Sequence, residues 1–144
     1  MKKQFIILSL LILLIGCISC DEVSYKVKTK TVKNGGSITF ISDLDDDNSY
    51  CSCEGKFLNQ VFVGTNILIA EIGPVNDIEE ISTSYSDLSK LTDRMQLRNG
   101  YGYILIPTLD GHRDRAIRMY VRFTKDNKYY VQYQEIALAN YPRY

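Results

Sequence analysis

Strict alternation of apolar and polar side chains near the end of the chain is the feature that most limits its fold. Residues 115–124 read RAIRMYVRFT and residues 129–139 read YYVQYQEIALA, separated by Lys125-Asp126-Asn127-Lys128. A period of two is typical of β-strands with one buried face. The sequence therefore predicts an antiparallel hairpin over residues 115–139 that turns near Asp126-Asn127.

The two faces of this hairpin differ in chemistry. Ile117, Met119, Val121 and Phe123 form the apolar row, and Arg118, Tyr120 and Arg122 form the other. Tyrosine rings stack on the apolar faces of sugars and arginine binds acidic groups, so the second row is a candidate ligand face. The alternative is structural, because cross-strand Tyr–Arg pairs also stabilise sheets.

Further strands are predicted along most of the chain. They cover residues 23–33, 37–42, 56–64, 66–72 and 101–106, with a hairpin turn at Asn34-Gly35-Gly36 and short helical turns near 77–81 and 86–91. The lysines of 23–33 are expected on its solvent face. With 144 residues, 45% of them apolar, the chain has room for one domain. We expect a mainly β domain over residues 23–144, a small antiparallel sandwich or a strongly bent sheet with a short helical insertion.

A short apolar run opens the chain. Lys2 and Lys3 precede residues 5–15, which read FIILSLLILLI. A spanning helix needs about 20 apolar residues, so a run of this length predicts the apolar part of a signal peptide.

The end of that run, Leu14-Ile15-Gly16-Cys17, resembles the lipobox of bacterial lipoproteins. The resemblance implies cleavage before Cys17, lipidation of its thiol and acylation of its amine, with several acyl chains holding the protein on a membrane. Residues 1–16 are then the signal peptide and 17–22 the lipidated tether. Cys20, followed by Asp21-Glu22, is the alternative lipid site, although a cysteine stands where its motif wants an aliphatic residue.

Several short motifs in the later part of the chain occur in a familiar order. They are Phe62-Val63-Gly64, Ile72-Gly73-Pro74-Val75, Asn99-Gly100-Tyr101-Gly102-Tyr103, Met119-Tyr120-Val121 and Val131-Gln132-Tyr133-Gln134. Together they resemble a family of small lipoproteins of Bacteroidetes over about residues 56–135. The resemblance implies a β-rich envelope protein and no particular activity.

An acidic stretch from residue 43 to residue 54 is the candidate metal site. Asp43, Asp45, Asp47 and Glu54 occupy positions 1, 3, 5 and 12 of an EF-hand-like loop. Such spacing lets hard oxygen ligands converge on Ca²⁺. The flanks read as strands rather than helices, so a solvated acidic turn is the other interpretation.

Cys51 and Cys53 form a Cys-x-Cys pair in the same stretch. An oxidising envelope favours pairing of thiols, and the sequence predicts a disulfide that involves them, although a bond between the two would close a strained ring. Cys20 is another partner for either.

The chemistry of the chain favours binding over catalysis. His112 is the sole histidine, and Lys plus Arg equal Asp plus Glu at 17 each, which gives no general attraction to nucleic acid. The sequence predicts a non-enzymatic binding or assembly component of the cell envelope, lipid-anchored in the outer membrane, with an envelope protein or glycan as partner. The alternative is a carbohydrate-binding accessory lipoprotein that uses the face of Arg118, Tyr120 and Arg122.

Overall fold

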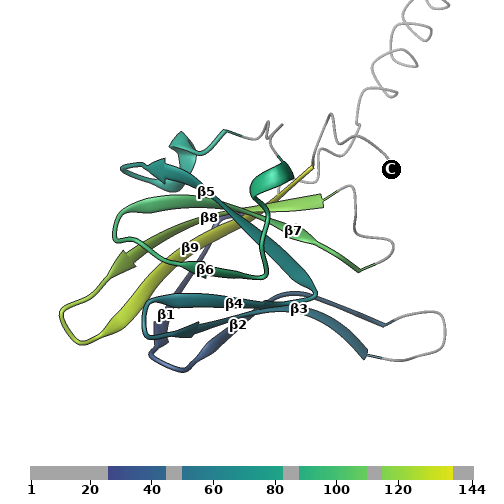
Figure 1. The fold of residues 1–144 in the computed structure, drawn as a ribbon, viewed down its shortest axis with the longest axis horizontal. Coiled ribbons are helices and arrows are strands. Elements are labelled where there is room, and N and C mark those ends of the chain that lie inside the picture. The colour runs from purple at the N-terminus through teal and green to yellow at the C-terminus, as the bar shows by residue number, and fades with distance from the viewer. Residues whose placement is uncertain (1–25, 45–49, 83–87, 110–114, 138–144) are drawn as a thin grey trace, which may run out of the picture.

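The computed structural model describes residues 26–44, 50–82, 88–109 and 115–137. It consists of nine strands and two single turns of 3₁₀ helix (Figure 1). The strands are β1 (Lys28–Lys33), β2 (Ser37–Leu44), β3 (Tyr50–Leu58), β4 (Val61–Thr65), β5 (Ile67–Pro74), β6 (Arg94–Gln96), β7 (Tyr101–Pro107), β8 (Arg115–Phe123) and β9 (Lys128–Ala137), and the 3₁₀ turns are η1 (Ile78–Glu80) and η2 (Leu88–Lys90).

The strands form two antiparallel sheets that pack face to face. The five-stranded sheet has the order β1-β9-β8-β7-β5, and the four-stranded sheet has the order β2-β3-β4-β6. The expected mainly β sandwich is therefore confirmed, and so is the hairpin of β8 and β9, in which Met119 pairs with Tyr133 and Val121 with Val131.

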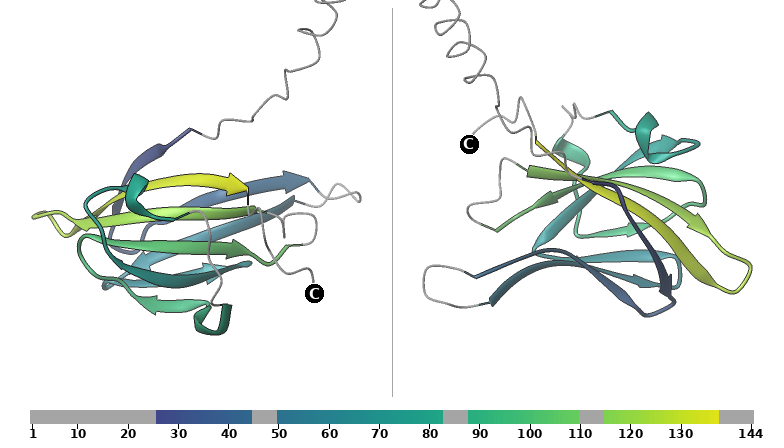
Figure 2. Two further views of the ribbon diagram at one scale, coloured as in Figure 1. Left: turned by 90° about the horizontal axis from the view of Figure 1, so that it is seen from above. Right: turned by 180° about the vertical axis from the view of Figure 1, so that it is seen from behind.

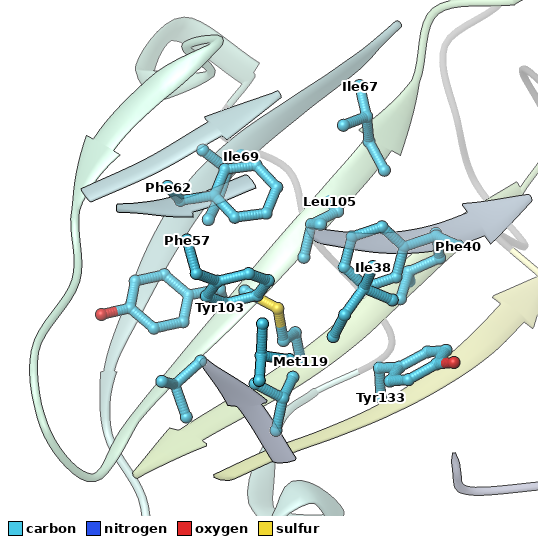
Figure 3. Packing of buried hydrophobic residues seen from close by; sticks show 14 of the residues in the cluster. Ile38, Phe40, Phe57, Phe62, Ile67, Ile69, Tyr103, Leu105, Met119 and Tyr133 are labelled. Atoms are coloured by element: carbon cyan, nitrogen blue, oxygen red, sulfur yellow. The ribbon is translucent and has the colours of Figure 1, made fainter. Parts of the chain in front are cut away.

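The core lies between the inner faces of the two sheets (Figure 3). Phe57 and Phe62 cross edge to face at a centroid distance of 5.6 Å, a geometry that aromatic quadrupoles favour. Gly55 makes room for this contact, because a Cβ there would come within 2.1 Å of the Phe62 ring. Aromatic rings from the four-stranded sheet thus fill the space above β7, β8 and β9.

The chain passes between the sheets four times, and two of these crossings are tight connections at opposite corners. Residues 34–36 carry it from β1 to β2 beside the start of β9, and Asn66 carries it from β4 to β5 beside the end of β7. The Asn34-Gly35-Gly36 turn was predicted as a hairpin, but β1 and β2 belong to different sheets. The Gly35 amide donates to the Phe57 carbonyl and the Phe57 amide donates to the Gly36 carbonyl, so this turn is tied to β3.

A third corner, at the start of β1 and the end of β2, stays open. Figure 2 shows β2 and β9 diverging toward it. Lys28 pairs with Tyr133 in the ladder between β1 and β9, and Tyr133 faces the core. Lys28 and Lys30 are exposed to solvent as expected, although their row, rather than the threonine row, lies on the same side of the sheet as the core. Val32 sets this orientation, since it belongs to the lysine row and is the residue of β1 that is buried.

The outer face of the five-stranded sheet carries a second apolar cluster. It is made of Ile78, Ile81, Ile104, Ile106, Ala116, Tyr120 and Ile136. Residues 75–82 lie across this face, with η1 begun by the Asp77 side chain, which accepts a hydrogen bond from the Glu79 amide. This segment is the short helical insertion expected near residues 77–81.

Candidate functional site

The predicted lipidation site lies outside the described residues, as do Cys20 and the tether before Tyr25. Among the described residues, no helix is long and apolar enough to cross a membrane. Lipidation of Cys17 stays a prediction.

The acidic stretch is shorter as a loop than the sequence indicated. Residues 50–54 were expected in the loop but belong to β3, where Glu54 pairs with Thr39 and Thr65 while Asp43 pairs with Cys51. Asp43 and Thr39 are four residues apart on β2, or about 13 Å at the rise of a strand. The Glu54 carboxylate accepts a hydrogen bond from the Ser52 hydroxyl at 3.0 Å. Glu54 is thus part of the sheet surface.

Asp45 and Asp47 lie outside the described residues. The part of the chain that the structure describes contains no cluster of three His, Cys, Asp or Glu side chains able to hold a metal ion. Calcium binding stays a prediction. The position of Glu54 in β3 does not support it.

Cys51 and Cys53 lie two residues apart on β3, and no disulfide joins them. The extended backbone accounts for the absence of a bond between the two, while a disulfide of either with Cys20, which lies outside the described residues, stays a prediction. Two steps along a strand separate Cα atoms by about 6.6 Å, at the upper limit for a disulfide. Cys53 is fully buried, and burial raises the pKa of its thiol to about 11. A buried neutral thiol is a poor nucleophile.

The predicted ligand face is largely covered. Arg122 is exposed, but Arg118 is 8% exposed and Tyr120 is 6% exposed. Tyr120 packs in the outer cluster beneath residues 75–81 rather than facing solvent. The alternation of apolar and polar residues predicted the correct face for these side chains. It could not predict that residues 75–81 cover that face.

Arg118 uses its guanidinium for hydrogen bonds within the protein. Nε donates to Gln134 Oε1 at 2.7 Å, Nη1 to the Ile81 carbonyl at 3.2 Å and Nη2 to Glu79 Oε2 at 2.7 Å. The guanidinium group of Arg118 therefore holds residues 79–81 against the sheet, which is a structural role.

A small pocket lies at the open corner of the sandwich, where sequence reasoning placed no site. It has a volume of about 40 Å³. Its lining residues, which define the corner pocket, are Lys26, Lys28, Phe40, Ile117, Tyr133 and Glu135. The sequence signal for this pocket is the pairing of the lysine row of β1 with the tyrosine row of β9. That pairing cannot be recognised unless the order of the strands in the sheet is known.

The corner pocket has an apolar floor and a charged rim. Phe40 and Tyr133 meet edge to face at 5.2 Å, and the Lys28 ammonium lies 5.9 Å from the centroid of the Tyr133 ring. Arg115 Nη1 lies 3.0 Å from Glu135 Oε1, and this ion pair offsets the charge of the acid among the described lining residues. Burial raises the pKa of Tyr133, so its hydroxyl keeps its proton at neutral pH and is able to donate it in a hydrogen bond.

This arrangement suits the binding of a small anionic group. Ammonium groups and a phenol proton are donors, and an aromatic floor accepts the carbon part of a ligand. Comparisons of the chain with protein-family models, with curated proteins and with solved structures find no match.

Proposed function

We propose that the chain is a lipid-anchored protein of the bacterial cell envelope, carried on the outer membrane, that acts by binding rather than by catalysis. The observation that carries this proposal is the sequence Leu14-Ile15-Gly16-Cys17, followed nine positions later by Lys26 at the rim of the corner pocket.

The tether sets how far the pocket can be from the membrane. Nine residues of fully extended chain span about 31 Å at most. A domain held at that distance samples ligands at the membrane surface, and several acyl chains would make the attachment effectively permanent. The buried state of Cys53, whose thiol pKa is about 11, favours binding over thiol chemistry.

Metabolic labelling with palmitate and membrane fractionation test the anchor. We expect the wild-type protein to carry label and to sediment with membranes, and Cys17→Ala to lose both properties. Cys20→Ala is the matched control, three residues away, and should keep both. If Cys20→Ala loses the label while Cys17→Ala keeps it, the lipid site moves to Cys20. Absence of label from the wild-type protein would refute the anchor.

A further inference from the structure

Tyr133 differs from the other tyrosines of the inner core. The Tyr103 hydroxyl accepts a hydrogen bond from the Arg98 amide at 2.7 Å, and the Tyr129 hydroxyl accepts one from the Gln60 amide at 2.7 Å. Tyr133 is 5% exposed, and its hydroxyl has no hydrogen bond to any residue of the described ranges. Buried polar groups are nearly always hydrogen-bonded, so a donor left over at a pocket indicates a site for a ligand or water.

The hydroxyl points away from the centre of the core. Figure 3 shows the Tyr133 oxygen directed away from Met119, and the side chain lines the corner pocket together with Lys26 and Lys28. Arg115 offsets the charge of Glu135. Among the described lining residues, the two lysines therefore leave an excess of positive charge, which favours an anion over a cation.

The lining of the pocket selects among anions. Its volume of about 40 Å³ suits a small charged group rather than a whole sugar or lipid. Phe40 and Ile117 also offer contact to a carbon attached to the acid, which an inorganic anion lacks.

We infer that the corner pocket binds a carboxylate group, whose oxygens are held by the ammonium groups of Lys26 and Lys28 and by the Tyr133 hydroxyl. This inference rests on the proposed binding role and gives it a ligand class. Two sources share this chemistry, a short aliphatic acid and an acidic sugar.

An NMR titration of the mature protein in detergent tests the inference. The probes are propionate and glucuronate, with propionamide as the neutral control and inorganic phosphate as the anionic one. We expect either carboxylate to shift the backbone amides of Lys28 and Tyr133, and the tighter of the two identifies the source. Equal binding of phosphate would show general attraction of anions and overturn the inference.

Two pairs of variants locate the binding. Tyr133→Phe removes the hydroxyl and keeps the ring, and we expect it to weaken carboxylate binding by about tenfold to a hundredfold. Tyr130→Phe, on the outer face of β9, should leave the affinity unchanged. Lys28→Gln should also weaken binding, while Lys30→Gln, on the same strand but outside the pocket, should not.

The unliganded protein provides a second measurement. Because the Tyr133 hydroxyl is unpaired within the described residues, Tyr133→Phe should keep or raise the melting temperature. A melting temperature lower than that of Tyr130→Phe would show that the hydroxyl is already satisfied. Absence of any shift with either carboxylate would show a pocket that holds water only. Both results would overturn the inference, and membrane fractionation of the same samples would report separately on the anchor.

Discussion

Arg118 joins the outer face of the five-stranded sheet to the segment that covers it. Its three hydrogen bonds end on β9, on the backbone of Ile81 and on Glu79. The Glu79 side chain is 67% exposed, so the ion pair itself is screened by solvent and contributes little. The larger contribution comes from satisfying the Ile81 carbonyl and Gln134 in a buried position.

Arg118→Met should therefore destabilise the protein, although methionine preserves much of the packed volume. We expect the free energy of unfolding to fall by about 1–3 kcal/mol, the usual cost of leaving buried polar groups unsatisfied. Urea unfolding monitored by circular dichroism measures this. Glu79→Gln is the matched control and should cost less than about 1 kcal/mol. Equal losses in the two variants would assign the stabilisation to the ion pair.

A periodic pattern shows on which face of a strand a side chain lies, but not whether that face is covered by another segment. Alternation assigned Arg118 to the face opposite Met119, and this is confirmed. It could not show that Arg118 is buried, because burial of that face depends on residues 75–82 returning over it. Those residues have no period that predicts their destination. The same limit explains why Tyr133 and Lys28 were not recognised as neighbours.

Among the elements, the turn between β3 and β4 is the clearest difference from the sequence prediction. Residues 56–64 read as one strand, yet the chain reverses at Asn59 and Gln60, whose φ angles are +51° and +62°. Two successive positive φ values define a type I′ hairpin turn, for which Asn-Gly is the strongest sequence signal. The turn was not predicted, because glutamine rather than glycine stands in its second position.

Gln60→Gly should stabilise the protein, because glycine adopts a positive φ without the steric cost that glutamine pays there. The backbone amide that donates to the Tyr129 hydroxyl is retained. We expect a gain of about 0.5–1 kcal/mol in the free energy of unfolding, seen as a higher urea midpoint. Gln96→Gly, in the neighbouring strand β6, lacks a positive φ and should destabilise instead. A loss in Gln60→Gly would mean that its side chain has a role in the fold.

The boundaries of β7, β8 and β9 follow from local chemistry that the sequence does show. The strand at 101–106 and the hairpin of residues 115–139 were predicted almost to the residue, because both carry long runs with strong strand preference. The strand predicted at 66–72 extends to Pro74 in β5. β5 is an edge strand, where a residue without an amide proton is tolerated.

The strands differ in how far neighbouring strands and burial protect them. β8 lies at the centre of the five-stranded sheet, and six of its nine residues are buried. β1 and β6 are edge strands. The order of strands in the sheets, and hence the open corner with its pocket, depends on contacts between distant segments that period and propensity do not encode.

Hydrogen–deuterium exchange should follow this order. We expect the amides of β8 to exchange at least about 100-fold more slowly than those of β6, since central strands open only in global unfolding whereas edges open locally. Exchange followed by NMR or mass spectrometry of peptides measures the rates. Similar protection in β6 and β8 would mean that the two sheets open together as one unit.

Pairing of the first described strand with the last has a consequence for how the protein is made. Among the described strands, β1 pairs with β9 alone, about 100 residues later in the chain (Figure 1). The five-stranded sheet is therefore incomplete until the end of the chain has been synthesised, and contacts of such long separation form late. The export that we propose for this chain would make use of the delay. A sandwich that lacks β9 cannot complete its sheet, so the chain would stay unfolded during transport and the sheet would close once β9 had crossed.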